Sequence, residues 1–413
     1  MIPYYYLILL ISLSAGLAYV NQRFIKLPFV IGLFFLSVVL SLVVIITKNF
    51  YAEPFLQIRD LVVQSDISSS VLNIFLGFLL FAGALHTNWF VLKNHLKNIS
   101  VLAVGGVLFS TIFIAFVFHY VALLLGLDIP MLYCFIFGAL ISPTDPIAVL
   151  SILKEAKVPE KVEITIVGES LFNDGIGVVL FIALTEMIGV NAVGFDAGHF
   201  AWLFLQEAVG GVIFGLVIGY TLHYLLSTID HYETEVLLTL AFVMLGYFIS
   251  STLHISGALA MVIMGLMVGN FRKGQAMSDR TEEYVAKFWE LVDVILNALL
   301  FILIALVLVV IDFDIKYLIL GVLSVLILIF SRFLAVSVPR RLFPRLLDIR
   351  KDEAKVIIWG GLRGGLSLAL VLSLPDNETR DILLVVTYIA VVFSILIQGI
   401  TIGRFSKRVL REQ

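Results

Sequence analysis

The sequence has few charged residues and almost no cysteine. Only 14% of its 413 residues are Asp, Glu, Lys or Arg, whereas 61% are hydrophobic and the mean hydropathy is +1.09. Soluble domains contain about a quarter charged residues, so this composition excludes a large soluble domain and places nearly the whole chain in membrane spans. The single cysteine, Cys134, excludes an intramolecular disulfide and a cysteine-rich metal site, and the seven histidines show no pair at metal-ligand spacing.

Apolar stretches long enough to cross a membrane recur along the whole chain. A helical span needs about 20 apolar residues, and windows of that length predict about thirteen spans. They begin near Pro3, Phe29, Ser69, Ile99, Met131, Val162, Ala201, Val236, Ile255, Glu290, Tyr317, Ala354 and Ile382. We therefore expect an all-α polytopic membrane protein.

Lys and Arg are unevenly divided between the two sets of loops, and these residues collect in cytoplasmic loops. Loops after odd-numbered spans and the C-terminal segment carry most of them. Loops after even-numbered spans carry only Lys48, Arg59, Lys316 and Arg380. This asymmetry predicts a multi-pass protein of the cell (inner) membrane with its N-terminus outside and its C-terminus in the cytoplasm.

Two spans contain residues that interrupt a helix. In the fifth, Pro143 and Pro146 each remove a backbone donor and disfavour helical geometry in the preceding residue, so that Asp145 would cap a second half-helix. In the twelfth, four glycines surround Arg363 in residues 360–365. Each of these spans is the second of a three-helix set, four to six and eleven to thirteen, and the two run in opposite directions. Paired breaks in inverted repeats predict the binding site of a secondary transporter.

Three carboxylates lie within the fifth and sixth spans. Asp145 belongs to the first break, and Glu169 and Asp174 belong to the sixth span. A carboxylate at bilayer depth costs a few kcal/mol or more, so such residues indicate a functional site. On a helix, Ser170 and Asp174 share one face, while Glu169 and Asn173 share the next.

Two arginines, Arg332 and Arg363, lie at depths similar to those of the acids. A rise of about 1.5 Å per residue favours the pairs Asp145–Arg363 and Glu169–Arg332, although the partners could exchange. Either pairing leaves one uncompensated negative charge, which we assign to Asp174, near the midplane. A lone buried carboxylate is stable with one proton or one monovalent cation and unstable when empty. If only the loaded site crosses, exchange is one for one and electroneutral.

Four motifs resemble those of one transporter family in order and spacing. They are Thr144-Asp145-Pro146, the Glu169-Ser170 and Asn173-Asp174 motif, Ser331-Arg332 to Pro339, and Trp359-Gly360-Gly361-Leu362-Arg363-Gly364. The family is that of the NhaP-type monovalent cation/proton antiporters, relatives of animal sodium/proton exchangers. The resemblance implies an NhaA-like antiporter fold and a homodimer, with a dimerisation domain and a mobile six-helix core that contains the crossed broken helices.

The resemblance also implies roles for single residues. Asp174 would bind sodium or a proton, assisted by Ser170 and the Thr144 backbone, with Asp145 and Asn173 in the same ion-binding group. Electrogenic relatives carry a second aspartate at the position of Asn173, so this residue indicates electroneutral exchange.

Other polar residues of the spans are given structural roles. Glu169, Arg332 and Arg363 are expected to offset one another and the helix dipoles. Ala82, in the third span, stands where several family members have an acid, which argues against a cation contact from that span.

Five segments follow from the span order. We expect residues 1–98 (spans 1–3) to form dimerisation-domain helices, 99–190 (spans 4–6) the first half of the transport core, 191–311 (spans 7–10) dimerisation and linking helices, 312–405 (spans 11–13) the second half of the core, and 406–413 a short cytoplasmic tail.

Several other residues of the spans have no predicted role in ion binding. Glu290 and Asp293 are expected to open the tenth span as favourable helix-start charges. Glu207 is expected at the membrane interface. Glycines such as Gly215 and Gly219 are expected to permit close helix packing.

The function that the sequence favours is electroneutral antiport of Na⁺ (or Li⁺) against H⁺ by alternating access, without a cofactor, enzymatic activity or a nucleic-acid partner. Potassium/proton exchange by the same fold is the main alternative, because a sequence shows ligand types but no cavity size. Broken helices in inverted repeats disfavour an ion channel. An intramembrane hydrolase, suggested by Gly168-Glu169-Ser170, would need a glycine at Phe172 and a histidine base at a similar depth.

Overall fold

A computed structural model describes residues 4–47, 72, 75–145, 152–153, 156, 158–188, 197–270, 278–311, 314–345 and 347–411, and all regular secondary structure in these ranges is helical. The first half contains α1 (Tyr4–Val20), η1 (Asn21–Ile25), α2 (Phe29–Thr47), α5 (Leu76–Leu85), α6 (Trp89–Leu92), η3 (Lys93–His95), α7 (Leu96–Ser100), η4 (Val101–Gly105), α8 (Gly106–Leu124), α9 (Met131–Ile141) and α11 (Glu160–Glu186). The second half contains α12 (Ala197–Leu226), α13 (Tyr232–Thr252), α14 (Gly257–Asn270), α15 (Asp279–Val307), α16 (Ile315–Leu342), α17 (Lys351–Trp359), α18 (Leu366–Leu372), α19 (Glu378–Val392), η5 (Phe393–Gln398) and α20 (Gly399–Arg411).

The lengths and compositions of these helices are those of a membrane protein. Within the described ranges, nine helices are long and apolar enough to cross a bilayer, and α5, α9 and α14 are shorter apolar helices. The fold is therefore that of an all-helical, multi-pass membrane protein. The count of thirteen spans stays a prediction, because it also needs the three short helices and the broken pair α17–α18, none of which by itself meets the length of a full span.

Most helices begin within a few residues of their predicted starts, and α2 and α9 begin at the predicted residues, Phe29 and Met131. The clear exception is α15, which begins at Asp279 and not near Glu290. Ser278 caps this helix by accepting a hydrogen bond from the backbone N–H of Thr281. A hydropathy window missed these first turns because they are polar.

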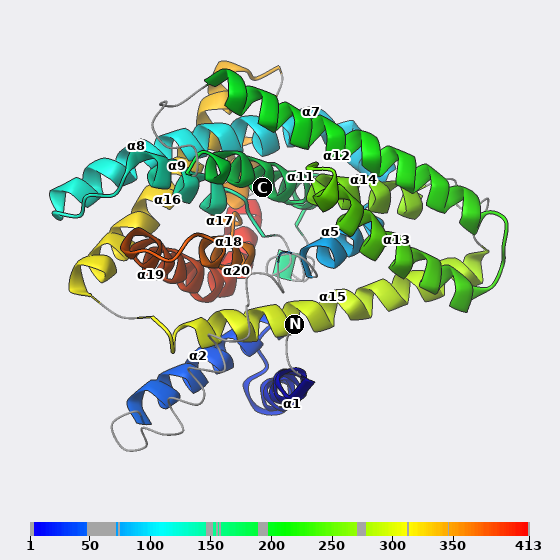
Figure 1. Ribbon diagram of the computed structural model, residues 1–413, viewed down its shortest axis with the longest axis horizontal. Helices are drawn as coiled ribbons and strands as arrows, with labels where there is room; N and C mark the ends of the chain where they lie inside the picture. The colour runs from blue at the N-terminus through cyan, green and yellow to red at the C-terminus, as the bar shows by residue number, and fades with distance from the viewer. Residues whose placement is uncertain are drawn as a thin grey trace.

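The helix α15 runs across the molecule, with α1 and α2 on one side and α17 to α20 on the other (Figure 1). It packs against α2, α5 and α13. The helix α11 lies near the centre and is the most buried of the nine long helices, whereas α1 and α12 are the most exposed. The residues of α11 are therefore enclosed by protein, as a polar helix at membrane depth requires.

Small residues let several helices approach closely. A Cβ atom placed on Gly215 of α12 would lie 2.7 Å from the carbonyl oxygen of Ala260, and one on Gly265 of α14 would lie 2.6 Å from that of Phe81. The packing role predicted for Gly215 is thus confirmed. In lipid there is no hydrophobic driving force between helices. The dispersion contacts that such close approach allows therefore help to hold the helices together.

Candidate functional site

One predicted helix break is present between α17 and α18, and at the position of the other the helix α9 ends at Ile141, shortly before Pro143. After α9 the chain leaves helical geometry at residues 142–145, where Pro143 lies, and between α17 and α18 it does so at residues 360–365. The second half-helix predicted to follow Pro146 falls on residues that the structure does not describe. Each break exposes main-chain groups that a continuous helix would have paired, and these groups need partners inside the protein.

The two breaks are joined to each other by hydrogen bonds. The backbone N–H of Asp145 donates to the carbonyl of Leu362, at 2.8 Å. The guanidinium of Arg363 donates to the carbonyl of Ser142 and, at 2.9 Å, to that of Pro143. A pair of unwound segments distant in sequence is thereby joined into one hydrogen-bonded unit.

This arrangement corrects one of the two predicted ion pairs. Arg363 binds main-chain carbonyls and not the predicted partner, the carboxylate of Asp145, and no Asp145–Arg363 ion pair occurs between these two described residues. The Asp145 carboxylate lies against Gly364, because a Cβ atom there would be 2.5 Å from its Oδ2. The prediction rested on the similar expected depths of the two residues. At a helix break, however, carbonyls without a helical partner compete for the guanidinium, and here they bind it.

The other predicted pair is confirmed. Arg332 of α16 and Glu169 of α11 are almost completely buried and make two contacts, with Nη2 and Oε2 at 2.8 Å. Nη2 also donates to the carbonyl of Ile357 on α17, at 3.2 Å. A bidentate, charge-assisted pair of this kind fixes geometry as well as charge. It ties α11 to α16 and α17 around the second break.

Three predicted site residues form a buried network between the first break and α11. The hydroxyl oxygens of Thr144 and Ser170 are 2.9 Å apart. The amide of Asn173 donates to the Thr144 hydroxyl at 3.0 Å, and its oxygen accepts from the Thr144 backbone at 3.3 Å. Asn173 therefore holds the break against α11 with both ends of its amide.

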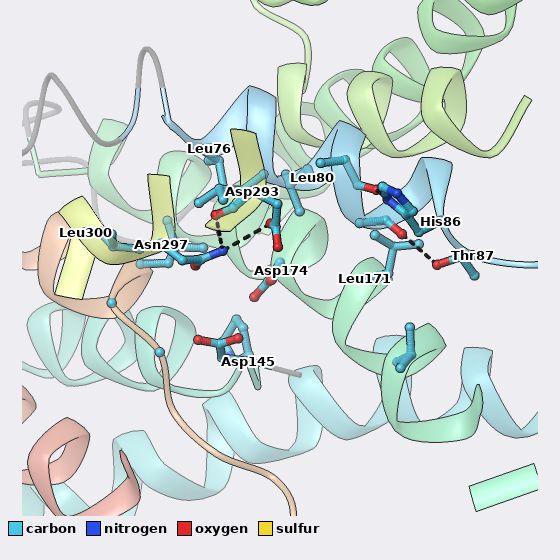
Figure 2. A pocket seen from close by; sticks show the side chains of 18 of the residues that line it. Leu76, Leu80, His86, Thr87, Asp145, Leu171, Asp174, Asp293, Asn297 and Leu300 are labelled. Atoms are coloured by element: carbon cyan, nitrogen blue, oxygen red, sulfur yellow. Dashed lines mark hydrogen bonds between the residues drawn. The ribbon is translucent and has the colours of Figure 1, made fainter. Parts of the chain in front are cut away.

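Asp174 lies in a cavity of about 610 Å³, together with Asp145. Figure 2 shows the two carboxylates directed toward the same space. In the part of the chain that the structure describes, no hydrogen bond or ion pair to the Asp174 side chain occurs. Thr144, Ser170 and Asn173 are buried beside the cavity but do not line it. The anionic group singled out in the sequence is thus accessible from the cavity and not neutralised by the described residues.

The cavity is large enough for a hydrated ion. At about 30 Å³ per molecule, it would hold about 20 waters. Among the described residues, no group of three or more His, Cys, Asp or Glu side chains is placed to hold a metal ion. The available ligands are oxygen atoms, which hard cations prefer.

Two cavity residues were missed by the sequence analysis. Asp293 and Asn297 of α15 line the cavity opposite α11, and Figure 2 shows Asp293 near Asp174. The expectation that Glu290 and Asp293 open their helix is wrong, because α15 begins more than two turns earlier, at Asp279. The spacing of four between Asp293 and Asn297 within an apolar span was the signal available in the sequence.

Asp293 also changes the charge balance. Counting only the acids of the fifth and sixth spans left one uncompensated charge, whereas Asp145, Asp174 and Asp293 all line the cavity. The predicted number of carboxylates at the site was too low because only acids close together in the sequence were included.

Gly177, one turn after Asp174, offers a first test of the site. A Cβ atom there would overlap the side chain of Pro143, so Gly177→Ala should displace the first break from α11. Misplacement of reacting groups by about 1 Å can cost ~100-fold in rate, and we expect at least a tenfold loss of transport. Gly106→Ala is the control, because nothing lies within 4 Å of its Cβ position. Equal transport by both variants in proteoliposomes would contradict the tight contact.

Comparison with known proteins gives one family. The family model described as "Sodium/hydrogen exchanger, transmembrane" matches residues 9–408. The chain is 43% identical over 408 residues to the Na(+)/H(+) antiporter NhaP of Pseudomonas aeruginosa, covering 98% of this chain and 96% of that protein. It is 27% identical over 329 residues to the Na(+)/H(+) exchanger beta of Oncorhynchus mykiss, covering 75% of this chain and 42% of that one.

A solved structure has the same fold. The sodium proton antiporter MjNhaP1 from Methanocaldococcus jannaschii superposes with a TM-score of 0.78 and 21% identity, over 98% of each chain. At this identity the likeness concerns the path of the chain and not the chemistry of individual side chains. The chemistry depends on the residues that line the cavity.

Proposed function

The chain belongs to the sodium/hydrogen exchanger family, and on this premise we propose that Asp174 is the group that binds sodium and a proton in turn. The protein is a membrane antiporter that exchanges sodium for protons, a transporter rather than a catalytic enzyme. Its substrates are the cation and the proton, and competition for a single carboxylate would couple them.

One observation carries this proposal. Asp174 faces the cavity without a partner among the described side chains, while Arg332 is engaged by Glu169, and Arg363 donates to carbonyls. A carboxylate in this setting is unstable when charged and empty, because no nearby cation offsets its desolvation. Either a proton or a sodium ion removes that instability, so the two ligands exclude each other.

The oxygen atoms around Asp174 suit an alkali cation. We propose Ser170 and Thr144 as neutral ligands. With the Thr144 hydroxyl donating to Ser170 and accepting from Asn173, each hydroxyl oxygen keeps one lone pair. Asp145 would add negative charge from the cavity wall, and Asn173 would act by holding Thr144 in place. Glu169, with its arginine partner, would keep the surrounding helices in position.

The architecture proposed around this site is that of alternating access. Residues 99–190 and 312–405 would form the transport core, with the crossed breaks at its centre, and residues 1–98 and 191–311 the dimerisation and linking helices. The hydrogen bonds between the breaks support this grouping, since they join the two halves of the core. Thirteen spans in NhaA-like inverted repeats would result if α5, α9 and α14, and the broken pair α17–α18 as a single span, also cross the bilayer.

The proposed setting is the inner membrane, with the N-terminus outside and residues 406–413 in the cytoplasm. Under this orientation the cavity would open to the cytoplasm, because Glu160 and Glu163, which line it, lie at the start of α11 and follow Lys154 and Lys157 in the sequence. The exposed apolar faces of α1 and α12 are proposed to meet lipid and a second copy of the chain.

Exchange at a single carboxylate is expected to be electroneutral. In proteoliposomes, a sodium gradient should drive proton flux at a rate that stays the same when the membrane potential is clamped at zero and then set to either sign. The reason is that Asp174 carries one positive charge in each direction. A rate that changes with voltage would contradict one-for-one exchange, and the absence of sodium-driven flux would contradict the function itself.

A further inference from the structure

We propose that Asp293 and Asn297 of α15 form an accessory cation site, which shares the transported cation with Asp174 while the cavity is open. This inference rests on the proposed role of Asp174 and extends it to the opposite wall of the cavity. It assigns a binding role to a helix outside the proposed transport core.

The amide of Asn297 is oriented by two acceptors. Its Nδ2 donates to the main-chain carbonyl of Asp293 at 2.8 Å and to the Asp293 carboxylate Oδ1 at 3.1 Å. Reversing the amide would place its oxygen against two acceptors, so the assignment of the two atoms is fixed by chemistry. The side-chain oxygen must therefore point away from Asp293.

That oxygen is buried and has no hydrogen-bond partner. Asn297 is 1% exposed, and its Oδ1 lacks a donor within the described ranges although the residue lines the cavity. A buried carbonyl oxygen without a partner is costly, and such groups call for an explanation such as an ion or a ligand. A cation in the cavity would supply the missing contact.

Asp293 supplies the negative charge of this accessory site. It lies fourteen residues after the first residue of α15, about 21 Å along the axis, where a helix start offers no stabilisation. Its neighbours Val292 and Val294 are apolar. A carboxylate within an apolar span is energetically costly, and such residues indicate a function. Figure 2 shows it beside Asp174, with Asp145 beyond.

The other charged groups around the cavity favour a cation. Lining it are the acidic residues Glu160, Glu163, Glu290, Asp145, Asp174 and Asp293, together with one histidine, His86. The His86 ring nitrogens lie 2.8 and 3.2 Å from the carbonyl oxygens of Ala82 and Ala286. A cavity lined by one sign of charge concentrates ions of the opposite sign.

The position of α15 makes the effect specific to one side of the membrane. Asp293 belongs to a helix that packs on α2, α5 and α13, whereas Asp174 belongs to α11. Movement of the core would carry Asp174 away from Asp293, so only the state with the open cavity would have both carboxylates near the cation. The accessory site would therefore strengthen cation binding from the cavity side alone.

The test measures sodium dependence from each side, in right-side-out and everted membrane vesicles. With sodium on the cavity side, Asp293→Asn and Asn297→Leu should each raise KM for sodium about tenfold, as expected for loss of one charged or polar ligand, with kcat little changed. With sodium on the other side, KM should match the wild type. Asp293→Glu, which restores the charge, should recover most of the lost affinity.

Glu283→Gln is the matched control, because it removes an exposed carboxylate of the same helix that does not line the cavity. Screening of an exposed charge should limit its effect on KM to less than about twofold. A wild-type KM for both Asp293→Asn and Asn297→Leu would overturn the accessory site, as would equal increases on the two sides or loss of kcat at constant KM.

Two measurements separate this inference from the role of Asp174. Asp174→Asn should retain a weak stabilisation of Tm by sodium, and the Asp174→Asn/Asp293→Asn double variant should lose it. No difference between these variants would overturn the accessory site. Exchange by Asp174→Asn would instead overturn the proposed function, whereas inactive Asp174→Asn with wild-type KM in Asp293→Asn would remove only the accessory site.

Discussion

Asp174→Asn is expected to reduce sodium-driven proton flux to that of protein-free liposomes while the protein remains folded. The substitution keeps the side-chain volume and removes the carboxylate that we propose holds a proton and a sodium ion in turn. Because no described side chain bonds to Asp174, nothing in its surroundings loses a partner. The measurement is proton flux in proteoliposomes after a sodium jump, with Tm recorded on the same preparation.

Glu186→Gln is the control for this experiment. It removes a carboxylate from the same helix, α11, at an exposed position that does not line the cavity. We expect wild-type flux from this variant. Sodium-dependent flux that persists in Asp174→Asn would show that another group binds the ions, and loss of flux together with loss of Tm would show a folding role.

Breaking the Glu169–Arg332 pair is expected to have the largest effect on stability. Removing one partner of a buried ion pair leaves a charge without compensation, which costs about 3–5 kcal/mol. Glu169→Gln and Arg332→Met should each lower the free energy of unfolding by an amount in that range, because both side chains are almost completely buried. Denaturant titration of the purified protein measures this, and the sodium KM of any folded fraction should change much less.

An exposed ion pair on α15 provides the comparison. Glu283 and Lys287 are both more than half exposed, and water and salt screen such a pair, so Lys287→Met should have little effect. The exchanged variant Glu169→Arg/Arg332→Glu should recover part of the stability lost by the single variants. Wild-type stability of both single variants would contradict the structural role of the pair.

The breaks and one ion pair could be predicted from the sequence, because helix-breaking residues act locally and the depth of a residue follows from its position in a span. Pro143 and the glycines of residues 360–365 disrupt a helix wherever it packs, and Glu169 and Arg332 needed only similar depths to be matched. The partner of Arg363 could not be found in this way. Its hydrogen bonds go to carbonyls of the other break, and which carbonyls lie within reach depends on how the two segments cross.

The sequence by itself determined that this chain is a helical membrane protein with ionisable groups in its interior. Hydropathy and helix-breaking residues act locally, and the bilayer allows few ways of satisfying a backbone. Only the tertiary structure decided which groups share the cavity. It placed Asp293 and Asn297, more than a hundred residues from Asp174, on the facing wall, and it left Thr144 and Ser170 buried on the α11 side, beside the cavity. The physical reason is that electrostatic contact depends on distance in space, which helix packing sets and sequence separation does not.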